Sequence, residues 1–117
     1  MLQFPIKNLT GTQSLLTEAM ARDIPKIGGQ ENVTDAIAHF KFFTPAGSWT
    51  WYMTELDQTT GEAFGKVFSS LCPDGEWGTF LLANDEYPEE SLAGIKANGM
   101  AIERDAHFQP TPMSQCK

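Results

Sequence analysis

The sequence contains no long uninterrupted apolar segment. A membrane-spanning helix needs about 18 or more consecutive apolar residues, and no such run occurs in the chain. The first residues, Met1 to Asn8, also lack the charged leader and apolar stretch of a secretory signal. We therefore expect a cytoplasmic protein that does not enter a membrane.

Potential metal ligands are few and scattered. The chain has two cysteines, Cys72 and Cys116, and two histidines, His39 and His107, and none of them stands at the short spacing that a zinc site requires. A disulfide between the two distant cysteines is disfavoured in a reducing cytoplasm. The sequence therefore predicts no metal site and no cofactor.

Motifs of common catalytic sites are also absent. There is no Gly-x-Ser-x-Gly nucleophile turn, no phosphate-binding loop and no His-Glu-x-x-His pair. Lysine and arginine total only 8 against 15 aspartates and glutamates, whereas sequence-independent binding to nucleic acid requires clustered positive charge. We predict no catalytic residue and no direct contact with nucleic acid.

What is present is the composition of a small globular protein. Hydrophobic residues make up 41% and aromatic residues 11% of the 117 residues. This is enough for one hydrophobic core, but the chain is too short for two. We predict a single domain over residues 1–117, with residues 1–9 and 113–117 loosely ordered.

A helix is expected near the N-terminus. Thr10 and Gln13 have the spacing of a capping box. Apolar residues follow at helical intervals, namely Leu15, Leu16, Ala19 and Met20. This pattern predicts a helix over residues 12–22 that ends before Pro25.

Alternating apolar and polar residues predict four strands, over residues 36–43, 49–55, 63–69 and 77–82. Turn signals between them favour an antiparallel meander. Pro88 before two acids predicts a second helix that Gly99 ends, followed by a short edge strand at residues 101–105. The expected fold class is therefore α+β: an N-terminal helix packed on a four-stranded, mainly antiparallel sheet, a short second helix and an irregular C-terminal segment.

A series of short motifs resembles one known family. In order, these motifs are Lys41-Phe-Phe-Thr-Pro45, Thr50-Trp51, Thr54-Glu-Leu-Asp57, Ala63-Phe-Gly65, Glu76 with Gly78, and Ile102-Glu-Arg-Asp-Ala-His-Phe108. Over residues 36–114 they are similar to the domain of unknown function 2958 family of small bacterial and phage proteins. The resemblance implies carriage by a plasmid, phage or conjugative element, and it transfers no catalytic or ligand-binding residue. Residues 68–74 and 84–99 depart from the family's pattern.

The negative charge is concentrated in one part of the chain. Residues 55–90 contain nine acidic residues and one basic residue, Lys66, for a net charge of −8, while the other residues sum to +1. A solvated face that serves solubility would explain this, and so would a surface that attracts a basic partner. The residues of this candidate acidic surface are Asp57, Glu62, Asp74, Glu76, Asp85, Glu86, Glu89 and Glu90.

Arg104 marks a second candidate site because it stands between two acids in the sequence. Its guanidinium would either bind the carboxylate or phosphate of a ligand or form an internal ion pair with Glu55, Asp57 or Glu76. The residues of this candidate ligand or ion-pair site are Tyr52, Glu55, Glu103, Arg104, Asp105 and His107.

Aromatic residues offer a further pattern. Trp49, Trp51, Tyr52 and Trp77 would either stack on nucleobases or form the core. Because acids rather than lysines or arginines stand near them, we favour the core. By strand alternation Tyr52 faces away from Trp51, and we expect it to be the more exposed ring.

Three functions follow from these patterns. The first is a non-enzymatic acidic accessory protein of a mobile element that binds a basic nucleic-acid-binding or defence protein of the host, as an anti-restriction or anti-CRISPR inhibitor. The second is a small-ligand or nucleotide-binding module around Arg104. The third is a small hydrolase that uses His107 with Glu55 and Glu103. A homodimer through the edge strand at residues 101–105 also stays open.

Overall fold

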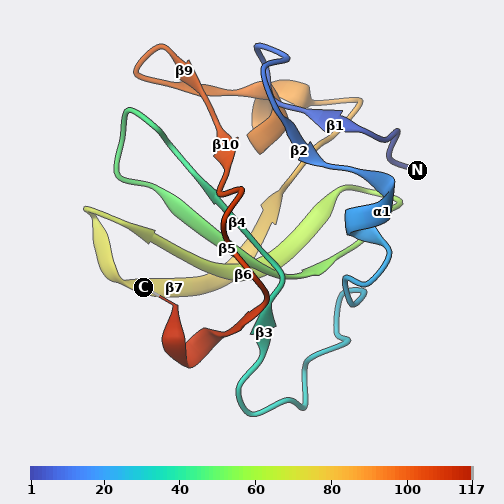
Figure 1. The fold of residues 1–117 in the computed structure, drawn as a ribbon, viewed down its shortest axis with the longest axis vertical. Coiled ribbons are helices and arrows are strands. Elements are labelled where there is room, and N and C mark those ends of the chain that lie inside the picture. Colours follow the sequence, from blue (N-terminus) through green and yellow to red (C-terminus); the bar gives the residue numbers. More distant parts are fainter. Residues whose placement is uncertain (117) are drawn as a thin grey trace.

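The fold is built around one five-stranded antiparallel sheet. The computed structural model describes residues 1–116. The strands of the sheet lie in the order β10-β4-β5-β6-β7, and Figure 1 shows them crossing the middle of the molecule. Their bounds are β4 Phe40–Phe43, β5 Thr50–Leu56, β6 Glu62–Ser69, β7 Cys72–Leu81 and β10 Glu103–Arg104.

Short elements make up the rest of the chain. Three two-stranded sheets pair β1 with β2, β3 with β11 and β8 with β9. The bounds are β1 Ile6–Lys7, β2 Ser14–Leu16, α1 Glu18–Ala21, β3 Ile37–Ala38, β8 Lys96–Ala97, β9 Met100–Ala101 and β11 Thr111–Pro112, with one-turn 3-10 helices η1 Pro88–Glu90, η2 Leu92–Gly94 and η3 Met113–Gln115. Residues 1–116 are thus mainly β, with the four-residue α1 as their one α-helix.

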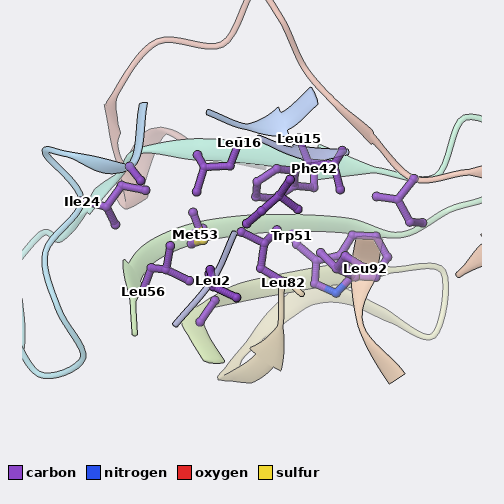
Figure 2. Close-up of a cluster of buried hydrophobic side chains, with 14 residues drawn as sticks. Leu2, Leu15, Leu16, Ile24, Phe42, Trp51, Met53, Leu56, Leu82 and Leu92 are labelled. Atoms are coloured by element: carbon purple, nitrogen blue, oxygen red, sulfur yellow. The ribbon is translucent and has the colours of Figure 1, made fainter. Parts of the chain in front are cut away.

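One face of the central sheet carries the main core. Phe42, Trp51 and Met53 lie on this face, and Figure 2 shows them in one cluster with leucines from distant parts of the chain. The N-terminal segment and residues 82–102 supply the covering side chains, which are Leu2, Ile6, Leu15, Leu16, Ile24, Leu82, Leu92 and Ile102. Burying each large side chain contributes about 1.5–3 kcal/mol, so this face holds the two covering segments on the sheet.

The opposite face of the sheet is covered only in part. Tyr52 packs there against Ala38, Met113 and Cys116 in a second, smaller cluster. The C-terminal segment supplies this cover through β11 and η3, where Thr111 pairs with Ala38. Alternation along β5 therefore gives the sheet two apolar faces of unequal size.

The predicted helix over residues 12–22 is wrong, and with it the α+β fold class. These residues form strand β2 and then α1, whose cap is Thr17 with its Oγ1 accepting a hydrogen bond from the N–H of Met20 at 3.2 Å. The carbonyl oxygen of the Asn8 side chain accepts from the backbone of Thr12 and Gln13 in place of the predicted capping box. A helix of this length is not stable by itself, and the extended chain buries Leu15 and Leu16 completely.

The predicted second helix is also wrong. Residues 88–99 form η1, η2 and the first half of the β8–β9 hairpin. Asn98 and Gly99 have φ values of 53° and 83°, the two positive values that a type I′ hairpin turn requires and that an Asn-Gly pair favours. The central sheet has five strands rather than four because β10 adds to it, with Arg104 opposite Phe42.

Two glutamine side chains form backbone hydrogen bonds that a neighbouring strand would otherwise form. The Gln13 amide accepts from the N–H of Arg104 at 2.6 Å and donates to its C=O at 2.9 Å, which covers the outer side of β10. The Gln30 amide does the same for Ile37, at 2.7 and 2.8 Å, and also donates to the C=O of Thr54 at 2.9 Å. A side-chain amide offers one acceptor and a donor group, as a peptide does, so backbone groups without a strand partner are satisfied.

We predict that Gln30→Met lowers the free energy of unfolding by about 3 kcal/mol, because buried backbone groups left without a partner each cost about 1–3 kcal/mol. The matched control is Gln109→Met at an exposed position, where the change stays within about 0.5 kcal/mol. Urea denaturation measures both values. Equal stability of the two variants would contradict the role of the Gln30 amide.

Candidate functional site

A cavity lies on the partly covered face of the sheet, next to β7. Its volume is ≈ 740 Å³, within the range of about 300–1,000 Å³ that ligand pockets occupy. Residues 27–36 form one wall, and Met113 with Ser114 of η3 forms another. We call this cavity the β7 groove; its floor consists of Thr54, Phe64, Lys66 and Trp77.

The floor of the β7 groove is aromatic and carries one cation. The rings of Phe64 and Trp77 are stacked with their centroids 5.7 Å apart. The ammonium of Lys66 lies 5.9 Å from the Trp77 ring centroid and 5.4 Å from that of Phe68. Within residues 1–116 Lys66 forms no ion pair. The floor therefore combines exposed ring surface with a positive charge that no carboxylate neutralises.

A β-bulge in β5 positions the wall of the groove. Met53 pairs with Gly65 and Glu55 with Phe64, so Thr54 is the extra residue. The bulge turns Glu55 away from the main core and onto the face of Phe64, where its carboxylate accepts from the N–H groups of Gly28 at 2.7 Å and Gln30 at 3.0 Å. The wall formed by residues 27–36 is thus fixed to β5 at two backbone positions.

Asp35 joins this wall to the C-terminal segment. Its carboxylate accepts from the Ser114 hydroxyl at 2.6 Å and from the Ser114 N–H at 3.0 Å. These two hydrogen bonds hold the pKa of the Asp35 carboxyl below its ordinary value. Both walls of the groove are therefore tied to each other as well as to the sheet.

The candidate acidic residues are at the surface. Asp57 is half-buried and the other seven are exposed, and none of the eight pairs with a lysine or arginine within residues 1–116. Asp57 accepts from the N–H groups of Thr59 and Thr60 in the β5–β6 turn, which lowers the pKa of its carboxyl. Glu76 is hydrogen-bonded to the Cys72 thiol, and the other six carboxylates have no such structural task among the described hydrogen bonds.

The strand register divides these acidic residues into two groups. Glu62 lies opposite Leu81, whereas Glu76 lies opposite Val67 at the other end of the β6–β7 pair. At about 3.3 Å per residue, roughly 17 Å of strand separates the two positions. Asp74 and Glu76 therefore form an acidic edge on β7, and the remaining acids gather around the β5–β6 turn and η1.

Four of the residues proposed around Arg104 share a second cavity of ≈ 550 Å³; they are Glu103, Arg104, Asp105 and His107. The guanidinium of Arg104 is half-buried, and its Nε donates to the C=O of Ser14 at 3.3 Å. It forms no ion pair within residues 1–116; Asp105 pairs instead with Lys41 at 3.7 Å. The internal ion pair considered for Arg104 is thus not among the contacts of the described residues.

The other two residues proposed for that site lie elsewhere. Tyr52 is only 3% exposed, with its ring against Phe68 at 5.7 Å, so the expectation that it is the more exposed ring is wrong. Glu55 lines the β7 groove and not the cavity of His107. The structure does not bring together the three residues that the hydrolase hypothesis requires.

Sequence patterns singled out Trp77 but not Phe64 and Lys66, which lie beside it in the β7 groove. The four aromatic residues considered as one platform are separated: Trp49 stacks on Trp51, Tyr52 packs on Phe68, and Trp77 stacks on Phe64. One signal was available for Glu55. Strict alternation would have placed this acid on the apolar face of Trp51 and Met53, a conflict that a bulge removes.

No metal centre or membrane span is found in the described part of the chain. Residues 1–116 contain no group of three or more His, Cys, Asp or Glu side chains that could hold a metal ion. No helix among them is long and apolar enough to cross a bilayer. Cys72 and Cys116 are free thiols, and burial raises the pKa of Cys116.

We predict that His39 titrates below the ordinary imidazole pKa of 6.5, because partial burial disfavours its charged form more than the nearby Asp23 carboxylate favours it. The unfolded chain then takes up the proton first, so stability present above pH 6.5 is lost as the pH falls through the folded-state pKa. NMR titration gives the pKa, and His39→Gln should flatten the dependence of unfolding free energy on pH. An imidazole that titrates at or above 6.5 would contradict this.

The groove, the acidic surface and the Arg104 cavity all lie in the part of the chain that known proteins resemble. No curated protein and no solved structure matches the chain. Residues 11–116 match the family described as "Protein of unknown function (DUF2958)", so the similarity extends into the N-terminal segment as well as the sheet. The chain therefore belongs to the DUF2958 family of proteins of unknown function.

Proposed function

We propose that the protein is a cytoplasmic, non-enzymatic accessory protein of a mobile element that binds a basic host protein through its acidic surface. The observation that carries this proposal is the exposure of seven of the eight candidate acidic residues with no ion pair to any of them within residues 1–116. Carboxylates that stabilise the fold have hydrogen-bond partners, as Glu55 and Asp35 do. The exposed acids are free for a partner.

Electrostatics favours this kind of binding. Like charges gathered on one region attract a partner of opposite charge, raise the association rate and select against other acidic proteins. The attraction weakens with salt because the screening length is about 8 Å at physiological ionic strength. Host defence proteins that bind nucleic acid have basic surfaces, so an anti-restriction or anti-CRISPR inhibitor is the form of the proposal that we favour.

A second candidate function rests on Arg104. Its guanidinium has one hydrogen bond and no ion pair among the described residues, and it lines a cavity with Lys41, His107 and Trp49. Cations beside an indole ring are suited to an anionic ligand with a planar group, such as a nucleotide.

The main proposal predicts that neutralising part of the acidic surface abolishes partner binding. We would compare Glu86→Gln/Glu89→Gln/Glu90→Gln with a control on two exposed acids outside the acidic surface and the β7 groove, Glu18→Gln/Asp23→Asn. Bacterial proteins captured on each immobilised variant at low and high salt are identified by mass spectrometry. Wild type and control should retain a basic protein at low salt, and the surface variant about tenfold less of it. Equal capture by all three would contradict the proposal.

The second candidate predicts that an anionic ligand stabilises the wild type but not Arg104→Ala. Thermal unfolding in the presence of a series of nucleotides and small organic acids measures this. No shift with any of them, or the same shift in Arg104→Ala, would exclude a ligand site at this cavity.

A further inference from the structure

We propose that the open edge of β7 binds an extended, basic segment of the partner protein, which adds a sixth strand to the sheet and seats its apolar side chains in the β7 groove. This inference rests on the proposed function and names the surface and the chemistry of the partner. Strand addition of this kind draws affinity from backbone hydrogen bonds and specificity from pockets for alternate side chains.

The two edges of the central sheet differ in whether they can accept a strand. β10 has two residues, and the Gln13 amide already occupies the N–H and C=O of Arg104 on its outer side. β7 has ten residues, of which Glu76–Leu81 pair in unbroken register with β6; a register shift and Pro73, which has no N–H, interrupt the edge before Glu76. Among residues 1–116, β6 is the one neighbour of β7 in the sheet. Every second peptide of such an edge directs its N–H and C=O away from the sheet. β7 is therefore the long edge open to pairing.

The side chains along β7 alternate between two environments. Trp77 lies opposite Lys66, on the side of the β7 groove, and is 48% exposed. Glu76 lies opposite Val67, on the other side of the sheet. Next to it on that side, the position of Gly78 has open space. An added strand would thus present alternate residues to an aromatic groove and to an acidic edge with room for a side chain.

The charges on the two sides of β7 determine which side chains the bound segment carries at alternate positions. The Lys66 ammonium in the groove repels basic side chains, so the groove takes the apolar residues. Asp74 and Glu76 take lysine or arginine. A second copy of this chain is a poor partner, because β7 contains no lysine or arginine to face these acids and like charges across a strand pair are destabilising. The occupant is therefore a heterologous segment that alternates apolar and basic residues.

The direct test uses the purified full chain and a synthetic acetylated, amidated octapeptide of alternating valine and lysine. There are four control peptides: four valines followed by four lysines, alternating valine and glutamate, and two alternating valine–lysine peptides that each have one of the two sets of alternate backbone nitrogens methylated. We expect the unmethylated alternating valine–lysine peptide and no more than one of its two methylated forms to bind, with amide shifts in NMR spectra concentrated in residues 72–81. Equal binding of the block peptide or of the methylated peptides in both registers would overturn strand addition.

Variants of the protein locate the contact. Trp77→Ala should weaken binding of the alternating peptide by about tenfold or more, as loss of a buried tryptophan anchor does. Its matched control is Trp49→Ala, which removes a similarly exposed ring directly before β5 and outside the β7 groove. Glu76→Lys should weaken binding, while Glu18→Lys should not. Unchanged melting temperatures show that each variant is folded. Binding that survives both Trp77→Ala and Glu76→Lys would overturn the inference.

The same variants separate this inference from the proposed function. If host-protein capture is lost in Glu86→Gln/Glu89→Gln/Glu90→Gln but kept in Trp77→Ala and Glu76→Lys, the acidic surface binds a partner without β7, and only the strand proposal fails. If none of these variants changes capture, the proposed function fails. A dimer in sedimentation that Glu76→Lys dissociates would identify a second copy as the occupant and overturn the heterologous segment.

Discussion

The position of the β7 groove depends on the hydrogen bonds that the Glu55 carboxylate accepts from Gly28 and Gln30. Residues 26–36 contain no helix or strand, and the backbone hydrogen bonds within them belong to turns over residues 26–33, which do not connect the segment to the sheet. The connections to the sheet come from two side chains. The Glu55 carboxylate of β5 accepts hydrogen bonds from the segment, and the Gln30 amide of the segment donates to the C=O groups of Ile37 in β3 and Thr54 in β5. A bulge of one residue at Thr54 directs the carboxylate to the correct face. The wall of the β7 groove thus follows from one extra residue in one strand.

Buried polar side chains have the same task elsewhere in this fold. Asn8 supports the turn before β2 and bonds the C=O of Ile102, and Gln13 covers the outer side of β10. Outside the central sheet, the described elements are two to four residues long and most residues lie in turns and irregular segments, which leave many backbone groups without regular partners. Such groups must be paired when they are buried. Among the described residues, no buried side-chain nitrogen or oxygen lacks a hydrogen-bond partner either.

The sequence allowed the central strands to be located because their periodicity is strong. Phe40 to Phe43 and Trp51 to Met53 alternate between two buried faces, and a period of two identifies such strands without knowledge of the fold. The N-terminal helix was predicted wrongly because adjacent leucines fit a helical stripe equally well, and only the rest of the molecule determines that both are buried in an extended chain. Asn98-Gly99 is a hairpin signal in the sequence, but it was read as the end of a helix because Pro88 and the two acids after it are typical of a helix start. The groove could not be predicted, since it depends on a bulge and on residues from three distant segments.

The pairing of β10 with β4 and of β11 with β3 also has a consequence for the order of events during synthesis. Strands β4 to β7 are consecutive and can pair as soon as residue 81 has left the ribosome. β4 can pair with β10 only after residues 103–104 have emerged, and β3 can pair with β11 only after residues 111–112 have emerged. Contacts between segments so distant in sequence form slowly. Until residues 103–112 emerge, the nascent chain has an unprotected strand at both ends of its sheet, and a chaperone or a prematurely bound partner would meet it in that state.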